Sequence, residues 1–202
     1  MRITELAKFF DLNENSLFID IGGYKGEFTQ NIILNYNSNC IIFEPNWEYF
    51  KECLNLFKDN NKVFVIHAGI GATSEIKNLY DHGMGTSFFY EWHKPLTSSE
   101  SYILSVNILQ NFKQIDAMKI NCEGSEYEII ESLGQYNLLK DIGNICVEFH
   151  PIEGLRDKKY QICQDILQKS HTKTFTSKRW EMWVKKYDNI PIATLDAREM
   201  AL

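Results

Sequence analysis

The sequence predicts an α/β protein built on a doubly wound, mostly parallel sheet. Short, nearly continuous apolar runs alternate along the chain with segments whose apolar residues recur at helical spacing. Strands of this apolar kind are typical of parallel sheets that helices cover on both faces. At 202 residues, 44% of them hydrophobic, the chain has the length of one domain with a full core.

The predicted elements follow one another in βα units. The first half contains a short helix at 3–10, strands at 16–21, 39–44 and 63–67, and helices at 26–36 and 47–58. The second half contains strands at 117–121 and 144–150, helices at 125–133 and 157–169, and a closing strand pair at 173–176 and 181–187. We expect a single domain over 1–202, with its core at 15–187 and a C-terminal tail at 188–202.

The middle of the chain is less regular. Short strands are predicted at 76–80 and 101–107. Between them, residues 81–101 contain glycine, proline and several aromatic side chains without a clear period. A loop of this length in a compact domain is commonly functional or disordered, and the aromatic residues argue against disorder. We therefore interpret it as an ordered lid or as an insertion that faces the substrate.

The stretch SLFIDIGGYKGEFT, residues 16–29, predicts a ligand-binding turn between the first strand and the first helix. Gly22, Gly23 and Gly26 let the backbone approach a ligand, and the helix that follows directs its free N–H groups toward it. The glycines do not have the G-x-G-x-x-G spacing of a dinucleotide site. In addition, the carboxylate of Asp20 would repel a pyrophosphate but attract an ammonium or sulfonium group. These features favour S-adenosylmethionine as the ligand.

Composition limits the other partners. The net charge of −6 argues against nucleic acid, whose binding rests on basic surface. The five cysteines are scattered and lack a C-x-x-C pair, which fits reduced thiols. No segment is apolar for long enough to form a signal peptide or a membrane span. We expect a cytoplasmic protein that does not bind membranes; its oligomeric state stays open.

Four segments, in this order, carry a resemblance to a known family: FIDIGGYKGEFT, FEPNWEYFKECL, KINCEGSEYEIIESL and VEFHP. The sequence resembles the FkbM family of S-adenosylmethionine-dependent methyltransferases from the first strand to about Lys186. The resemblance implies a seven-stranded, Rossmann-like methyltransferase fold. It also implies O-methyl transfer to a hydroxyl of a sugar, a glycan precursor or a small natural product. The chain departs from the family at Asn121, where an aspartate is most common.

The predicted cofactor-binding residues follow the carboxyl ends of the strands, where ligands of doubly wound sheets bind. Glu44 can accept hydrogen bonds from both ribose hydroxyls, and Asn121 can contact the methionine end. The full set is Asp20, Gly22, Gly23, Gly26, Glu44, Ala68, Ile70 and Asn121. The alternative for Asp20 is a helix N-cap, and for Glu44 a surface acid that caps the next helix.

The predicted catalytic residues are His150, Glu148 and Glu123. Removing the proton of a high-pKa hydroxyl requires a base, and histidine is suited to that role near neutral pH. We expect His150 to be this base, Glu148 to orient it or the acceptor, and Glu123 to lie near the transferred methyl group. Alternatively, EGSE is an N-terminal capping arrangement and His150-Pro151 a strand-ending turn.

No metal site is expected, although acidic strand ends could hold Mg²⁺. Two competing functions remain. One is a non-catalytic relative that binds S-adenosylmethionine, which Asn121 motivates. The other is a nicotinamide-dependent oxidoreductase, which the glycine spacing disfavours.

Overall fold

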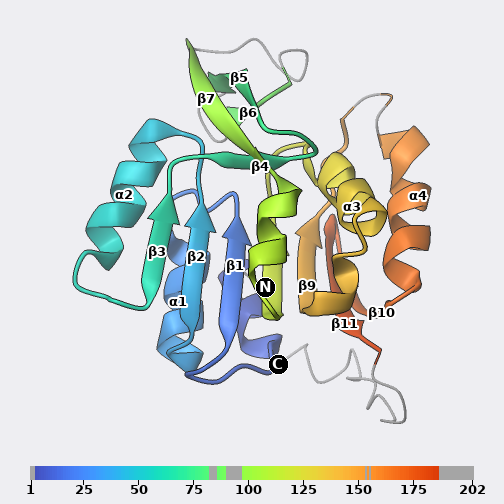
Figure 1. Cartoon of the computed structure of the whole chain (residues 1–202), viewed down its shortest axis with the longest axis horizontal. Coiled ribbons are helices and arrows are strands. Elements are labelled where there is room, and N and C mark those ends of the chain that lie inside the picture. The colour runs from blue at the N-terminus through green and yellow to red at the C-terminus, as the bar shows by residue number, and fades with distance from the viewer. Residues whose placement is uncertain (1–2, 82–85, 90–96, 153, 155, 187–202) are drawn as a thin grey trace.

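A computed structural model describes residues 3–81, 86–89, 97–152, 154 and 156–186. Its main element is a seven-stranded sheet with the order β3-β2-β1-β8-β9-β11-β10 (Figure 1). The strands are β1 (Leu17–Ile21), β2 (Asn39–Phe43), β3 (Val63–Ile66), β8 (Ile115–Ile120), β9 (Ile142–Glu148), β10 (His171–Ser177) and β11 (Trp180–Lys185). β3, β2, β1, β8 and β9 pair in parallel, and β11 pairs antiparallel with both β9 and β10. The predicted mostly parallel, doubly wound sheet is confirmed.

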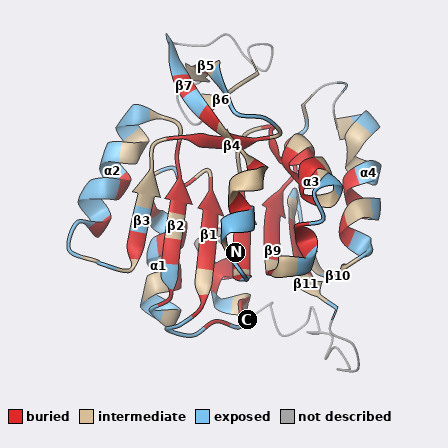
Figure 2. Ribbon diagram, in the orientation of Figure 1, coloured by how far each residue is buried: buried red, intermediate tan, exposed pale blue. Residues whose placement is uncertain are grey.

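Both faces of this sheet are covered. The elements that cover them are the 3₁₀ helices η1 (Ile3–Phe9), η3 (Val106–Asn111) and η4 (Leu139–Asp141) and the α-helices α1 (Glu27–Tyr36), α2 (Trp47–Phe57), α3 (Glu126–Gln135) and α4 (Arg156–Gln168). Neighbouring residues of β1 show the arrangement, because Phe18 packs in a cluster with Phe28 of α1 while Ile19 packs in the cluster that contains Ile130 of α3. The central strands are accordingly buried on both sides (Figure 2), which explains their continuous apolar sequence.

A second sheet of four strands lies across the carboxyl ends of the parallel strands (Figure 1). Its order is β4-β7-β5-β6, and its strands are β4 (Gly69–Gly71), β5 (Glu75–Asp81), β6 (Thr86–Ser87) and β7 (Thr97–Ser105). β5 and β7 pair antiparallel along the whole of β5.

The prediction of one loop over 81–101 was wrong at 81, at 86–87 and at 97–100, which belong to β5, β6 and β7. The N-terminal part of β7 reads TSSES, a polar sequence without strand-like alternation, because most of it is exposed. Its pairing with β5 rather than burial makes it a strand. The parts of the predicted lid at 82–85 and 90–96 lie outside the described residues.

Candidate active site

A cavity of about 170 Å³ lies at the carboxyl ends of β1, β2 and β8, where the strand order reverses. Its walls come from the turn after β1, the segment after β2, strand β4, the segment after β6 and the loop after β8. The lining residues are Ile21, Gly22, Tyr24, Glu44, Pro45, Tyr49, Gly69, Ile70, Thr86, Phe88, Asn121, Cys122 and Glu123.

Of the three turn glycines, only Gly22 lines the cavity. Its φ is +82°, and a Cβ at this position would lie 1.9 Å from the carbonyl oxygen of Asn121, so no other residue fits. Gly23 and Gly26 instead allow the turn to pack against its neighbours. A Cβ at Gly23 would meet the side chain of Ile42, and one at Gly26 the ring of Phe57.

Asp20 is fully buried and does not line the cavity. Its Oδ1 accepts a hydrogen bond from the Lys119 ammonium at 2.8 Å, and its Oδ2 accepts one from the Thr29 hydroxyl at 2.7 Å. The same ammonium donates to the Gly22 carbonyl at 2.5 Å. Asp20 therefore acts on the site by anchoring Lys119 and the turn, not as a carboxylate exposed to a ligand. Lys119 was missed, although a lysine in the apolar run AMKI was a usable signal.

Glu44 lines the cavity and is 3% exposed. Its Oε2 accepts the Tyr24 N–H at 2.7 Å and its Oε1 the Asn46 N–H at 2.8 Å. Burial raises the pKa of Glu44 to about 7, although both hydrogen bonds lower it. The helix that follows is capped by Asn46, whose Oδ1 accepts from two N–H groups of the first turn of α2, and not by Glu44. Each carboxylate oxygen can accept a further hydrogen bond, because an ionised carboxylate has about four lone-pair sites.

Asn121 and Ile70 also line the cavity, whereas Ala68 is buried outside the lining. The Oδ1 atom of Asn121 is buried, and no described group lies within hydrogen-bond distance of it. A buried acceptor without a partner is costly unless a ligand supplies the donor. Next to it, the rings of Tyr24 and Tyr49 meet edge to face at 4.5 Å. Sequence reasoning missed this aromatic pair, because Tyr24 and Tyr49 are 25 residues apart and only the fold brings them together.

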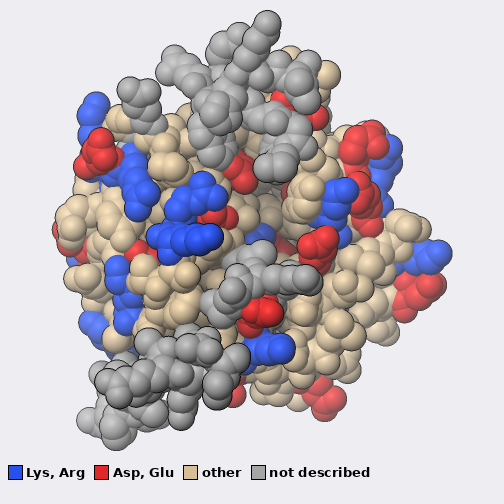
Figure 3. Space-filling view, turned by 180° about the vertical axis from the view of Figure 1, so that it is seen from behind, with Lys and Arg blue, Asp and Glu red and all other residues tan. Residues whose placement is uncertain are grey.

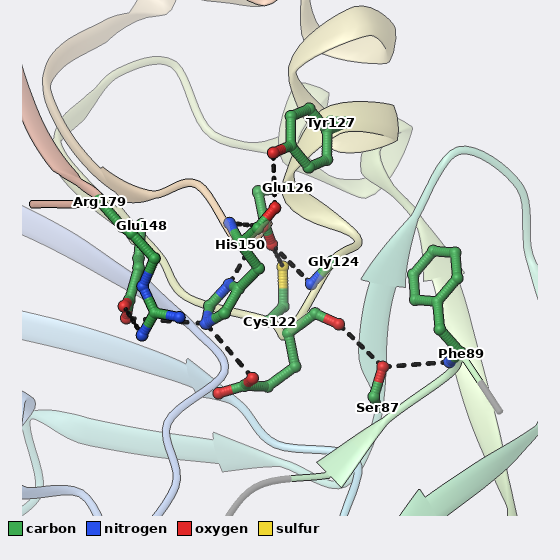
Figure 4. A network of polar contacts seen from close by, with 10 residues as sticks. Ser87, Phe89, Cys122, Gly124, Glu126, Tyr127, Glu148, His150 and Arg179 are labelled. Carbon is green, nitrogen blue, oxygen red and sulfur yellow. Dashed lines mark hydrogen bonds and ion pairs between the residues drawn. The ribbon is translucent and has the colours of Figure 1, made fainter. Parts of the chain in front are cut away.

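The structure places the other two predicted catalytic residues, Glu123 and Glu148, beside His150. Figure 4 shows His150 with Glu148 and Glu126. His150 is 1% exposed, and its Nε2 lies 3.2 Å from Glu123 Oε2 and 3.8 Å from Glu148 Oε2. A fourth residue, Glu126, accepts from the backbone N–H of His150 at 2.6 Å and contacts its Nδ1 at 3.1 Å. Only Glu123 also lines the cavity.

Carboxylates dominate the electrostatics around His150. Burial lowers the pKa of His150, but the hydrogen bond to Glu126 and the charges of Glu126, Glu123 and Glu148 outweigh it, so that the pKa is raised above its ordinary value. Burial raises the pKa of Glu123, while the imidazolium opposes that shift. Glu148 forms an ion pair with Arg179 at 2.6 Å, which holds it at the edge of the cluster.

The capping alternative for EGSE holds in part, because Glu126 Oε2 accepts the Gly124 N–H just before α3. Ser125 is the N-cap of α3 and makes no side-chain capping bond, and Glu123 lies before the helix in a left-handed conformation with φ +53°. His150 and Pro151 do follow the end of β9, but the His150 side chain is held by carboxylates. In the described part of the chain, no group of three or more His, Cys, Asp or Glu side chains is arranged to hold a metal ion.

Comparison with known proteins identifies the family. The sequence matches the methyltransferase FkbM domain over residues 20–191. No curated protein matches the sequence. A Streptococcus mutans protein in complex with SAH has a TM-score of 0.59 at 13% identity, covering 92% of this chain and 99% of that one. An rRNA methylase from Streptococcus thermophilus has a TM-score of 0.55 at 12% identity, covering 90% and 92%.

A precorrin-6y C5,15-methyltransferase from Geobacter metallireducens has a TM-score of 0.52 at 12% identity, covering 92% of this chain and 88% of that one. Identities this low establish a shared fold. Because an rRNA methylase has this fold, the comparisons lend no support to the exclusion of nucleic acid as a partner. Over the described residues, no helix combines the length and the apolarity that crossing a bilayer requires.

The family match spans the turn after β1, the cavity walls and the His150 cluster, and it overturns the nicotinamide-dependent alternative. The chain belongs to the FkbM family of S-adenosylmethionine-dependent methyltransferases.

Proposed function

We propose that the protein transfers a methyl group to a hydroxyl of a sugar, a glycan precursor or a small natural product, with Glu123 as the base. The observation that carries the proposal is the position of Glu123: it is the one member of the described His150 cluster that also lines the cavity. Its side chain is 25% exposed, so an acceptor can reach it.

The cavity has the groups that S-adenosylmethionine requires. Glu44 can accept from ribose hydroxyls, as an acid at the end of the second strand does in related folds. The free Oδ1 of Asn121 can accept from the amino group of the methionine end, and this acceptor role needs no negative charge. Tyr24, Tyr49 and Ile70 offer apolar and aromatic surface to the adenine. When bound, the cofactor supplies a methyl group on a positively charged sulfur.

Glu123 is better placed than His150 to receive the proton of the acceptor. Both ring nitrogens of His150 face carboxylates, Nδ1 toward Glu126 and Nε2 toward Glu123 and Glu148. His150 does not line the cavity, whereas Glu123 does. Burial raises the pKa of Glu123, which increases its basicity, while the charge of His150 opposes that shift. In this proposal the hydroxyl proton moves to the Glu123 carboxylate, and His150 stabilises that carboxylate before the transfer.

The preference for a hydroxyl acceptor rests on the family resemblance and on the presence of a carboxylate base. An RNA nucleotide and a non-catalytic role are the alternatives. We expect the protein with S-adenosylmethionine to form S-adenosylhomocysteine in the presence of suitable sugars or hydroxylated metabolites, and not with RNA.

Glu123→Gln tests the base directly. The turnover should fall by roughly 10²–10⁴-fold, the usual contribution of a general base, while cofactor affinity by calorimetry stays unchanged. Glu48→Gln, which changes an exposed glutamate on α2, is the control and should leave both quantities unchanged. An unaltered rate in Glu123→Gln would place the base elsewhere. Tight cofactor binding without product for any hydroxyl acceptor would favour the non-catalytic alternative.

A further inference from the structure

Glu126 is a fully buried carboxylate beside His150, and the proposed chemistry does not use it directly. It lies in the first turn of α3 and is 0% exposed. Both of its oxygens are occupied. Oε1 accepts from the backbone N–H of His150 and contacts its Nδ1, and Oε2 accepts from the Gly124 N–H at 2.9 Å and contacts the Cys122 thiol at 3.7 Å.

We infer that Glu126 is a positioning residue for the methyl transfer: it determines which nitrogen of His150 faces Glu123, and it holds the loop that carries Glu123. This inference rests on the proposed function of Glu123. It assigns Glu126 no contact with the substrate or the cofactor.

The first part follows from hydrogen-bond chemistry. An ionised carboxylate can only accept, so the Nδ1 atom that faces Glu126 at 3.1 Å must carry a hydrogen. The ring is further fixed because the same oxygen accepts from the His150 backbone N–H and because the Tyr127 hydroxyl donates to the His150 carbonyl at 2.6 Å. With Nδ1 at Glu126, the other ring nitrogen, Nε2, lies 3.2 Å from Glu123 Oε2. Figure 4 shows the His150 ring beside Glu126.

The second part concerns the loop between β8 and α3. Glu123 has φ +53°, a left-handed conformation that costs a residue with a side chain about 1–2 kcal/mol. The residues on both sides of it, Cys122 and Gly124, are held by Oε2 of Glu126. From the other side, the Ser87 hydroxyl donates to the Glu123 carbonyl at 2.8 Å. These contacts hold the strained loop in the shape that presents Glu123 to the cavity.

Glu126 also contributes to the balance of charges around His150. The groups that face His150 come from four places: Glu126 from α3, Glu123 from the loop after β8, Glu148 from β9, and Arg179, paired with Glu148, from the turn between β10 and β11. With His150 charged, these five groups carry a net charge of about −1, and a proton accepted by Glu123 brings it to zero. Without the Glu126 carboxylate, the pKa of His150 should fall, because burial lowers it and the hydrogen bond to Glu126 is the largest effect that raises it.

Glu126→Gln tests the inference, because it keeps the volume of the side chain and removes its charge. We expect the pKa of His150, followed by NMR titration and assigned with His150→Asn, to fall by about 1–3. The turnover should fall by about 10–100-fold, as for other residues that orient a reacting group. The acceptor KM and the cofactor affinity should stay unchanged. Glu128→Gln on the same helix is the matched control, since Glu128 is partly buried but does not contact His150 or the cavity.

The outcomes separate this inference from the proposed function. An unchanged His150 pKa in Glu126→Gln overturns the inference whether or not an acceptor is known, and so does a lowered pKa with unchanged turnover. If Glu126→Gln does not fold, the ¹⁵N chemical shifts of the His150 ring in the unmodified protein show which ring nitrogen carries a hydrogen. A protonated Nδ1 supports the inference, and a ring protonated at Nε2 alone overturns it. Failure of Glu123→Gln to lower turnover would instead contradict the proposed function.

Discussion

The two carboxylates on the cavity wall differ in the groups that stabilise their charge. Glu44 and Glu123 are both carboxylates on the cavity wall whose pKa burial raises. Glu44 is held by two backbone N–H groups, whereas Glu123 is held by the imidazolium of His150. The first arrangement suits a permanent acceptor of ligand hydrogen bonds. The second suits a group that gains a proton during the reaction.

The pKa of about 7 for Glu44 predicts a pH-dependent cofactor affinity. Ligand hydroxyls need the ionised carboxylate as acceptor, so affinity should rise as the pH rises through about 7 and then level off. Stability should change in the opposite direction. Because the folded-state pKa is raised above the ordinary 4.5, the contribution of Glu44 to stability is complete below about pH 4.5 and is lost as the pH rises through about 7.

Calorimetry with S-adenosylhomocysteine across about pH 5 to 9 measures this dependence. Glu44→Gln should bind at least about tenfold more weakly, a loss of about 1.4 kcal/mol, and should lack the change near pH 7. A wild-type affinity that is flat across that range would contradict a ligand contact at Glu44.

At the level of elements, the turn between β1 and α1 lines the cavity and also connects the two halves of the sheet. The Gly22 N–H donates to the Phe43 carbonyl at 2.9 Å, and the Asn121 N–H donates to the Ile21 carbonyl at 3.0 Å. The turn therefore connects the ends of β2 and β8, the strands on either side of β1. Helix α1 then begins after Gly26, with no side-chain capping bond, and leaves N–H groups of its first turn for other acceptors.

Gly22→Ala should disrupt this junction. A Cβ would collide with the backbone of Asn121, and the φ of +82° is itself unfavourable for alanine. We expect a loss of unfolding free energy well above the ~1–2 kcal/mol that positive φ alone costs, together with loss of cofactor binding. Gly154→Ala is the matched comparison, because Gly154 has φ +69° and nothing lies within 4 Å of its added Cβ. If Gly22→Ala and Gly154→Ala lose the same unfolding free energy in urea, the backbone of Asn121 can move to relieve its contact with the added Cβ.

The whole molecule combines a parallel sheet, which positions the cavity, with a small sheet that lies over it. The two are joined by side-chain contacts: the Ser101 hydroxyl of β7 donates to the Pro45 carbonyl, and Ser87 of β6 donates to Glu123. Charges of both signs are interspersed on the visible part of the face opposite to that of Figure 1 (Figure 3). The net charge of the whole chain is −6.

RNA binding tests the acceptor class at this scale. Fluorescence anisotropy with a labelled RNA of about 20 nucleotides should show no binding at protein concentrations up to about 100 µM at physiological salt. Lowering the salt should change little, because few phosphates would be neutralised. A micromolar affinity with a steep salt dependence would instead point to a nucleic-acid acceptor and would overturn the proposed substrate class.

Several features of the protein could be predicted from the sequence because they depend on local patterns. Continuous apolar runs predicted the buried parallel strands, glycine spacing and Asp20 predicted a site at the turn after β1, and motif order predicted the family. Sequence patterns were least informative for strands that are held by backbone pairing and not by burial of apolar side chains. In β7, the polar first half is a strand because it pairs with β5. Sequence patterns also could not distinguish the predicted residues that line the cavity from those that lie buried outside it.

By itself, then, the sequence determined the fold class and named a small set of polar residues at the strand ends as a candidate site, because spacing along the chain controls which side chains share a strand end or a helix face. Only the tertiary structure decided their roles. The carboxylate of Asp20 is occupied by Lys119, 99 residues away, and His150 is held by Glu126, 24 residues away. Such pairings depend on how strands and helices meet in space, and a buried charge takes its role from the partners that it meets there.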